Sequence, residues 1–303
     1  MNSFNTKSVF IIGVTGYVGG SIAVKLLEKG FRVYGLVRHA DDIESVKNLG
    51  VKPVHTKLDG NPEGYTILQK VEIVINAADS DDTFLIAFIL KALEGTDKMY
   101  IHTSGGGIVG DKAEGKYPGT EIYDDIPQFP LLERMGRVVI DKEVISYSKK
   151  GVYTVVICPT LVYGIGKGIK KDSSQVPALI KAAEKNKNVV LIGSGANLTS
   201  NVHIDDLTDL YVLAIEKANS GSFFFAENGT VSFLEIGYSI ISRLGYKQDT
   251  IQQLSIEDAI ALWGPIMAHF GLGSNILVNS DRARKELGWH PKYDNLLQEI
   301  ASN

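Results

Sequence analysis

The chain has 303 residues, of which 44% are hydrophobic and 22% charged, ordinary values for a folded globular protein. Its 31 basic and 35 acidic residues leave a net charge of -4, which argues against nucleic acid or an anionic membrane as the main partner. The single cysteine, Cys158, excludes an intramolecular disulfide and a cysteine-built zinc site, and it favours a reducing compartment, which we expect to be the cytoplasm.

The first 160 residues alternate between short β-rich runs and helix-like stretches. Strands are predicted at residues 9–13, 32–37, 51–58, 72–77, 99–103 and 153–158, and helices at 18–29, 41–49, 81–93 and 133–150. Gly30, Gly50 and Gly151 directly follow three of these helices, as is typical of helix C-termini. Strand–helix–strand alternation at this spacing predicts an α/β fold with a Rossmann-type, doubly wound parallel sheet.

After Pro159 the alternation loosens. Helices are predicted at residues 176–185, 206–218, 234–244, 256–270 and 281–287, with one further strand at 222–226. We expect a smaller C-terminal lobe over the carboxyl ends of the strands, where open α/β sheets bind their ligands. The predicted division assigns residues 1–160, with about 201–227, to a nucleotide-binding domain, and residues 161–200 and 228–303 to an interleaved substrate-binding lobe.

A glycine motif with the spacing G-x-x-G-x-x-G joins the first predicted strand to the first predicted helix. It contains Gly13, Thr15, Gly16, Tyr17, Val18 and Gly19. Glycine lets the backbone turn sharply and approach a pyrophosphate closely, while amides at the helix N-terminus satisfy the phosphate charge. These residues are therefore assigned to dinucleotide binding; the alternative is a tight turn without a ligand.

The end of the second predicted strand indicates which dinucleotide to expect. An NAD site usually places Asp or Glu there for the ribose 2′-hydroxyl, whereas this chain has Arg38 and His39. Arg38 is a permanently charged planar fork that suits a phosphate, so NADP is predicted in preference to NAD. The alternative is that Arg38 is a solvated surface charge and that Asp41 or Asp42 turns back to the ribose.

Short motifs are spread over nearly the whole chain. They are T-G-Y-V-G at 15–19, N-A-A at 76–78, H-T-S-G at 102–105, C-P-T-L-V-Y-G at 158–164, V-H-I-D-D at 202–206 and E-L-G-W-H-P at 286–291. Together they resemble the short-chain dehydrogenase/reductase superfamily, in its extended, NAD-dependent epimerase/dehydratase form. The resemblance implies that the cofactor lies against Leu58, Asp59, Ala77, Ala78, Thr103, Pro159, Thr160, Leu161 and Val162, with the first two near the adenine.

The catalytic pattern of that superfamily is incomplete here. Its members typically carry Ser or Thr after the fifth strand and Tyr-x-x-x-Lys in the next helix, where the tyrosine exchanges a proton with the substrate oxygen. The resemblance aligns the serine position with Gly105, next to Ser104, and the tyrosine and lysine positions with Glu133 and Arg137. No tyrosine occurs between residues 124 and 146. A literal Tyr-x-x-x-Lys at 163–167 lies in a glycine-containing turn, so we do not expect it to be the catalytic pair.

Ser104, Glu133 and Arg137 are therefore the candidate catalytic residues. Arg137 replaces lysine as a cation that holds ribose hydroxyls, but it does not readily release a proton. Glu133 serves as an acid only if burial raises its pKa; the alternative is a helix-surface ion pair with Arg134 or Arg137. Thr103, Tyr123 and a bound water are further candidate donors.

Three further segments carry expectations about the site and the assembly. Residues 108–130 are either a loop over the active-site mouth or a solvated excursion. Residues 262–270 are apolar on more than one face and are expected in the core; the alternative, which the resemblance implies, is that they shape the substrate cavity. Residues 84–90 are apolar all round and need cover on both sides, from a homodimer partner or from the lobe, and they are too short to span a bilayer.

The sequence predicts an NADP(H)-binding oxidoreductase of an atypical extended type, acting on an unidentified small carbonyl or alcohol. The alternative is a non-catalytic NADP(H)-binding sensor or regulatory protein, and nucleotide-sugar epimerisation ranks third because it needs the missing acid–base pair. A small-molecule substrate and a homodimer are the expected partners. The six histidines show no metal-ligand spacing, so no metal is expected.

Overall fold

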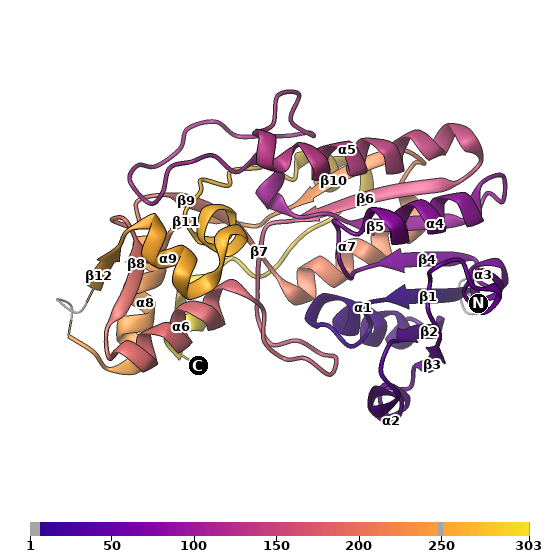
Figure 1. The fold of residues 1–303 in the computed structure, drawn as a ribbon, viewed down its shortest axis with the longest axis horizontal. Coiled ribbons are helices and arrows are strands. Elements are labelled where there is room, and N and C mark those ends of the chain that lie inside the picture. Colours follow the sequence, from indigo (N-terminus) through magenta and orange to yellow (C-terminus); the bar gives the residue numbers. More distant parts are fainter. Residues whose placement is uncertain (1–6, 248–250, 303) are drawn as a thin grey trace.

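The computed structural model describes residues 7–247 and 251–302. Its main strands are β1 (Ser8–Ile12), β2 (Arg32–Val37), β3 (Lys52–His55), β4 (Ile73–Asn76), β5 (Met99–Thr103), β6 (Tyr153–Pro159) and β10 (Ser222–Ala226). Within the described residues these seven strands form one parallel sheet in the order β10-β6-β5-β4-β1-β2-β3 (Figure 1). The predicted α/β class and doubly wound parallel sheet are confirmed.

Helices cover both faces of this sheet, and its central strands β1 and β4 are buried along their whole length. In β1, Val9 and Ile11 pack with α1 (Tyr17–Glu28) and α7 (Ile204–Lys217). Phe10 and Ile12 point to the other face and pack with α3 (Pro62–Lys70), α4 (Thr83–Leu93) and α5 (Leu132–Ser146). Successive side chains of a strand alternate between faces, so a strand that buries apolar side chains on both faces lies between two helical layers. The short α2 (Ile43–Asn48) lies in the connection from β2 to β3.

The lobe at the other end of the molecule has a buried core of its own. The core contains residues of α6 (Gln175–Asn186), α8 (Phe233–Leu244), α9 (Ile256–Trp263) and α10 (Leu296–Ser302). The strand β9 (Leu198–His203) lies between β7 (Leu161–Tyr163) and β11 (Thr230–Ser232), and β12 (Ile251–Leu254) pairs with β8 (Val189–Ile192). Figure 1 shows this lobe beside the carboxyl ends of the large sheet.

Two helical segments differ from the predicted elements. Helix α3 is not among the predicted helices, although Asn61 caps it and Pro62 opens it. The single predicted helix at 256–270 is wrong, because α9 ends at Trp263 and Gly264 has φ +79. Residues with a side chain rarely adopt that conformation, so the glycine separates α9 from a π-helical turn at Met267–Leu272.

The segment 108–130 lies between β5 and α5 and is hydrogen-bonded to residues 274–278. The Asp111 carboxylate accepts hydrogen bonds from the backbone N–H and the side-chain amide of Asn275, at 2.8 and 2.9 Å. Ser274 donates to the Asp111 carbonyl oxygen at 2.6 Å, and Tyr123 forms a bridge with Val278. The segment is thus fixed against residues 274–278. No helix in the described ranges combines the length and the hydropathy needed to cross a membrane.

Candidate active site

The glycine motif forms a tight turn between β1 and α1, and its glycine positions have no space for a side chain. Gly13 has φ +89, and a Cβ atom there would lie 2.6 Å from the carbonyl oxygen of Ala77. A Cβ on Gly16 would lie 3.1 Å from the Gly13 carbonyl oxygen, and one on Gly19 would collide with it. The turn therefore meets the steric requirement of a pyrophosphate-binding loop.

The N-terminus of α1 carries no competing negative charge. Gly16 is its N-cap, without a side-chain cap, and its first turn contains no acidic residue. The amide dipoles at a helix N-terminus favour an anion, so this end suits a pyrophosphate. Thr15 and Val18 lie half-buried in the same turn. The Tyr17 hydroxyl donates to the Gly164 carbonyl oxygen at 2.8 Å, so only the backbone of Tyr17 faces a ligand in this turn.

A cavity of about 620 Å³ lies beside the carboxyl ends of β2 and β3, and we call it the adenine-side cavity. Its lining brings together Arg38, Leu58 and Asp59, three residues that the sequence assigned to the cofactor. His39 is not among the described lining residues, although it follows Arg38 directly. Asp41 and Asp42, the alternative ribose ligands, are also outside that lining.

The outer side of α4 contributes to the adenine-side cavity. Phe84 and Phe88 line it together with Lys57, and Phe84 is 89% exposed. Leu85 and Ile86 are buried against the sheet, so the helix is covered on one side only at its start. The two phenylalanines form an apolar wall of the kind a flat base packs against, and Lys57 adds a cation near Arg38.

Most residues assigned to the nicotinamide side are held in place by the protein's own groups. The Ala77 N–H donates to the carbonyl oxygen of Ile12 at 2.9 Å. The hydroxyl of Thr103 lies 2.7 Å from that of Tyr211, and Thr160 donates to the carbonyl oxygen of Ala226 at 3.0 Å. These contacts fix the backbone around Ala78 and around residues 159–162.

A second cavity, of about 530 Å³, opens beside the carboxyl ends of β5 and β6, and we call it the arginine cavity. The sheet domain lines it with residues 105–107 and 159–161 and with two arginines, Arg134 and Arg137. The lobe lines it with Trp263, Ile266, Met267 and Phe270. Its volume lies in the range of about 300–1,000 Å³ that is typical of small-molecule sites.

Two segments that the sequence analysis discussed lie near this cavity. Residues 262–270 belong to the lobe core, where Ala268 is buried and Trp263 and Met267 pack against it, and four of their large side chains also form the cavity wall. The α9 break at Gly264 turns these side chains toward the sheet domain. Residues 108–130, for which the sequence left a loop or a solvated excursion open, contribute none of the described lining residues of the arginine cavity.

Arg137 reaches from α5 to Asp81, which precedes α4, in a two-point ion pair. Its Nε donates to Asp81 Oδ1 at 2.8 Å, and its Nη2 donates to Asp81 Oδ2. The hydrogen bonds from Arg137 lower the pKa of Asp81, so the carboxylate is charged at neutral pH. Gly105 packs close to this guanidinium, since a Cβ there would lie 3.3 Å from Arg137 Nη1. The charge of Arg137 is therefore compensated within the protein.

Arg134 is the opposite case, because its charge has no such partner. It is 5% exposed, and its guanidinium carbon lies 3.9 Å from the ring centroid of Phe270. Its side chain donates no hydrogen bond to any residue of the described ranges, and its Nε is buried without a partner. Stacking of this kind contributes about 0.5–2 kcal/mol, whereas desolvating a guanidinium costs several kcal/mol. Burial, and then the charge of Arg137, lower the pKa of Arg134.

Glu133 does not reach the arginine cavity. Its carboxylate is exposed and lies 2.5 Å from Lys112 Nζ, whose hydrogen bond lowers the pKa of Glu133. A carboxylic acid with a lowered pKa is ionised at neutral pH and has no proton to donate. The structure thus places Glu133 in a surface ion pair, with Lys112 rather than with the expected Arg134 or Arg137 as its partner.

The Ser104 hydroxyl forms a hydrogen bond with a carboxyl group that the sequence analysis did not single out. Its Oγ lies 2.7 Å from Asp141 Oδ2, and both side chains are buried. Burial raises the pKa of Asp141 to about 7, against smaller lowering effects of the Ser104 hydrogen bond and the Arg137 charge. Asp141 therefore exchanges a proton near neutral pH, where an ordinary aspartate is fully ionised.

A histidine and a tyrosine extend this buried network. His102 Nε2 lies 3.7 Å from Asp141 Oδ1, and His102 Nδ1 lies 3.3 Å from the hydroxyl of Tyr100. Burial lowers the pKa of His102 to about 4, so its ring is neutral at pH 7. The proton that titrates near neutral pH in this network is therefore held by Asp141.

The single cysteine lies next to the same network. Cys158, in β6, is fully buried. Burial raises the pKa of its thiol, and the charge of Asp141 raises it further. The thiol is therefore uncharged at neutral pH and is a poor nucleophile there.

Arg134 and Asp141 are the candidates that sequence reasoning missed. With Val138 they follow the spacing i, i+4, i+7 along α5, and all three are buried. That spacing defines one face of a helix, and Glu133 lies outside it. Val138 and Val144 are buried in the same helix, but Leu132, Met135 and Val139 are apolar and exposed, so the apolar pattern of α5 alone does not identify the buried face.

The side chains of the literal Tyr-x-x-x-Lys contact different partners and do not form a catalytic pair. Tyr163 lies in β7 and donates to the carbonyl oxygen of Tyr293 at 3.0 Å. Lys167, in the following loop, lies 3.4 Å from Asp205 Oδ2. In the described ranges no group of three His, Cys, Asp or Glu side chains is placed to hold a metal ion.

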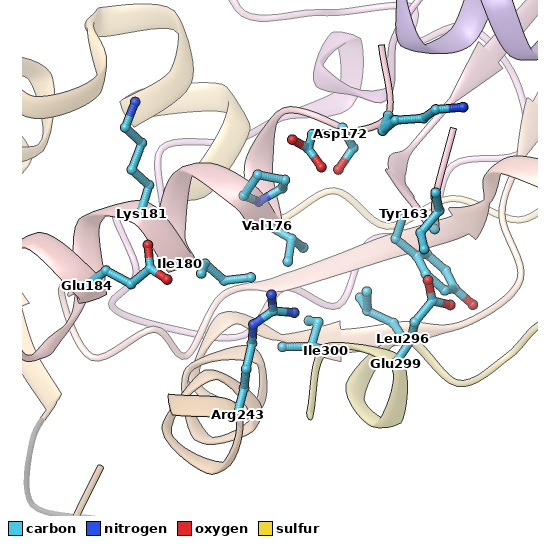
Figure 2. A pocket seen from close by; sticks show the side chains of 15 residues that line it. Tyr163, Asp172, Val176, Ile180, Lys181, Glu184, Arg243, Leu296, Glu299 and Ile300 are labelled. Atoms are coloured by element: carbon cyan, nitrogen blue, oxygen red, sulfur yellow. The ribbon is translucent and has the colours of Figure 1, made fainter. Parts of the chain in front are cut away.

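A larger cavity, of about 670 Å³, lies within the lobe between α6, α8 and α10 (Figure 2). Figure 2 shows Arg243 extending from α8 toward Val176 and Ile300. Glu299, also in the lining, lies 3.6 Å from His203 Nε2. The described lining includes none of the residues assigned to the cofactor or to catalysis, so the chemistry is assigned to the arginine cavity instead.

Comparison with known proteins agrees with this geometry. A family model described as "NAD dependent epimerase/dehydratase family" matches residues 9–224. An uncharacterised protein of Schizosaccharomyces pombe is 30% identical, and the alignment covers 97% of this chain and 98% of that protein. A 4-hydroxy-2-methyl-3-oxo-4-farnesyl-3,4-dihydroquinoline-1-oxide ketoreductase of Stigmatella aurantiaca is 23% identical, over 92% of this chain and 91% of that protein.

Solved structures share the architecture. A dTDP-glucose 4,6-dehydratase from Bacillus anthracis, determined in complex with NAD, superposes with a TM-score of 0.77 at 16% identity. The superposition covers 98% of this chain and 96% of that chain. At this identity the likeness establishes the common fold, from the glycine turn to the lobe.

Proposed function

Because the chain belongs to the NAD dependent epimerase/dehydratase family, within the extended short-chain dehydrogenase/reductases, we propose that it is an NADP(H)-dependent oxidoreductase. Its proposed substrates are small carbonyl compounds or the corresponding alcohols. The observation that carries the proposal is the largely apolar arginine cavity, which borders residues 159–161, the expected nicotinamide contacts. The similarity to a ketoreductase supports the same reaction class.

The residues present fit a nicotinamide dinucleotide. Gly13, Gly16 and Gly19 would hold the pyrophosphate against α1, where added side chains have no space. Arg38 and Lys57 would hold a 2′-phosphate at the adenine-side cavity, which is the argument for NADP over NAD. When bound, the dinucleotide supplies a hydride to a carbonyl carbon or accepts one from an alcohol carbon.

Ser104 and Asp141 are the proposed source of the proton that a reduced carbonyl oxygen needs. Ser104 directly precedes Gly105, which lines the arginine cavity, and its Oγ is bonded to Asp141. With a pKa of about 7, Asp141 holds a proton on part of the molecules at neutral pH and returns it to Ser104 Oγ after transfer. In alcohol oxidation the same groups take the proton in the opposite direction.

Arg137 is proposed to hold ribose hydroxyls beside the substrate. Asp81 fixes its guanidinium through two hydrogen bonds, so the side chain does not need to be ordered when a ligand binds. In this proposal, the two roles of the missing tyrosine–lysine pair are therefore carried by residues of two different elements. Arg137 supplies the cation from α5, and Ser104 supplies the hydroxyl from the end of β5.

The cavity wall disfavours nucleotide-sugar epimerisation. Trp263, Ile266 and Met267 present apolar surface to the substrate space. A sugar diphosphate needs many hydrogen-bond donors and two compensating charges, and it would leave this wall in contact with polar groups. A compact, largely apolar carbonyl compound covers the wall and leaves its oxygen for the polar end of the cavity.

NADPH oxidation over a panel of aldehydes, ketones and quinones tests the proposal, with calorimetric titration of NADPH and NADH in parallel. We expect NADPH to bind more tightly than NADH and at least one carbonyl compound to be reduced. Tight NADPH binding without reduction of any compound would favour the non-catalytic NADP(H) sensor. Binding of neither dinucleotide would refute both functions.

A homodimer through α4 and α5 belongs to the same proposal. Leu132, Met135 and Val139 are 79%, 46% and 57% exposed and lie on one side of α5. An apolar stripe of this kind favours a second copy as its cover. Light scattering should give twice the chain mass, and the double variant Met135→Glu, Val139→Glu should give the mass of one chain; a monomeric wild type contradicts the inference.

A further inference from the structure

We propose that Arg134 binds an anionic group of the substrate, and that the substrate is a monocarboxylate whose apolar body packs against the lobe wall of the arginine cavity. This inference rests on the proposed function and specifies its substrate class. It concerns a residue that aligns with neither position of the tyrosine–lysine pair.

The first argument is the unpartnered charge of Arg134. It lines the cavity, yet only 5% of it is exposed, and Nε is buried with no partner among the described residues. Its Nη atoms also make no hydrogen bond within that part of the chain. Stacking on Phe270 offsets only part of the desolvation cost. A buried cation is normally paired, so the partner is expected to arrive with the ligand.

The second argument is the charge balance around the cavity. Arg137 is neutralised by Asp81, and Glu133 is paired with Lys112 on the surface. Asp141 lies beneath the site and is half protonated near pH 7, its charge directed at Ser104. One positive charge, that of Arg134, therefore remains for the ligand. A single charge fits a monoanion, whereas a diphosphate would bring excess negative charge into a largely apolar space.

The third argument is the shape of the site. The guanidinium carbon lies 3.9 Å from the centroid of the Phe270 ring, and this contact holds the guanidinium at the cavity wall. A planar fork held in this way matches a carboxylate, which accepts two parallel hydrogen bonds. Beyond it, Trp263, Ile266 and Met267 provide apolar surface without a further cation. The geometry selects a carboxylate attached to an apolar, preferably flat, body.

Direct binding to the full chain, with and without saturating NADPH, is the primary experiment. Benzoate, benzamide and inorganic phosphate are titrated into wild type, Arg134→Met, Arg134→Lys and the control Lys112→Met. We expect benzoate to bind at least about 10-fold more tightly than benzamide or phosphate. In Arg134→Met the benzoate affinity should fall about 10- to 100-fold, and in Lys112→Met it should stay within about twofold.

Three results would overturn the inference. They are benzoate binding that Arg134→Met leaves unchanged, equal affinities of the wild type for benzoate and benzamide, and, with saturating NADPH, tighter binding of phosphate than of benzoate. If Arg134→Met does not fold, Arg134→Lys carries the test, because a lysine retains the charge but loses the fork. Its benzoate affinity should fall about 3- to 10-fold, and an unchanged affinity overturns the two-point contact.

Turnover separates this inference from the proposed function. The substrates are 4-formylbenzoate and its methyl ester, which differ in the carboxylate alone. We expect kcat/KM to be at least about 10-fold higher for the carboxylate in wild type, and this preference to disappear in Arg134→Met. Equal reduction of both compounds supports the oxidoreductase and overturns the carboxylate site. Arg134-dependent benzoate binding without any reduction supports the site and refutes the proposed reaction.

Discussion

The Ser104 hydroxyl and the Asp141 carboxyl group lie 2.7 Å apart in a place closed to solvent, one at the end of β5 and the other on α5. Asp141 lies eight residues after Glu133, about two helical turns along α5. The group that exchanges a proton is therefore deeper in the domain than the position at which the superfamily carries its tyrosine. This arrangement defines the first two predictions.

Asp141→Asn should change the pH dependence of stability. Folding raises the pKa of Asp141 from 3.8 to about 7, so the folded chain binds more protons than the unfolded chain between these values. Its contribution to stability is complete below about pH 4, is lost as the pH rises to 7, and leaves a buried charge above that. The variant should be more stable than wild type at pH 8, on the order of 2–4 kcal/mol, in urea unfolding.

His102 provides an internal control for this pH dependence of stability. Its pKa falls on folding from 6.5 to about 4, so the unfolded chain binds more protons in that range and stability is lost as the pH falls through it. In wild type this effect opposes that of Asp141. In Asp141→Asn the His102 effect remains alone, and stability should rise more steeply from pH 4 to 6.5. Parallel curves for wild type and variant would contradict the buried network.

Ser104→Ala should slow turnover without weakening dinucleotide binding. Loss of a positioned proton donor typically lowers kcat about 100-fold or more, while the NADPH dissociation constant should stay within about twofold. The kcat of wild type should titrate near pH 7, and Asp141→Asn should remove that titration. Ser146→Ala, at the far end of α5, is the matched control. Full activity of Ser104→Ala would remove Ser104 from the mechanism.

Arg38→Ala should discriminate between the two dinucleotides. Arg38 lines the adenine-side cavity, so its loss should raise the NADPH dissociation constant about 10- to 100-fold and leave that of NADH within about twofold. Lys29→Ala, an exposed cation at the end of α1, should change neither value. Calorimetry provides both constants. Equal wild-type affinities for NADPH and NADH would contradict the NADP assignment.

Two glycine substitutions should have opposite effects. A Cβ on Gly19 would collide with the Gly13 carbonyl oxygen, so Gly19→Ala should destabilise the chain by about 2–4 kcal/mol and abolish NADPH binding. A Cβ on Gly136, within α5, would meet no neighbouring group within 4 Å, so Gly136→Ala should stabilise the chain by about 0.5–1 kcal/mol. Thermal unfolding measures both. A neutral Gly19→Ala would show that the turn is adaptable.

The sheet could be predicted well because its signals are local. The limits of β2 and β5 agree with the predicted strands at 32–37 and 99–103, since short runs with β-branched and aromatic residues, bounded by glycine or polar residues, specify such strands. The short lobe strands could not be found in this way. The strand β9, for example, pairs with β7 and β11, and β7 lies more than thirty residues earlier, so these pairings leave no periodic trace in the sequence.

Part of the candidate site could be predicted because its signals are local as well. Gly13, Arg38 and residues 159–161 were found because each lies at a strand end, a position that the chain order fixes. Glu133 was chosen by aligning the tyrosine position of the superfamily, and a shift of one residue on a helix rotates a side chain by about 100°. That rotation separates the exposed Glu133 from the buried Arg134.

The buried position of Cys158 allows local opening of the sheet domain to be measured by thiol labelling. The thiol is the only one in the sequence, and it is fully buried in β6 beside Asp141. A thiol reagent modifies it only in molecules whose sheet has separated from the covering helices, so the labelling rate measures that event without an introduced probe. Protection by added dinucleotide, read from this rate, gives binding energies in the absence of any known substrate.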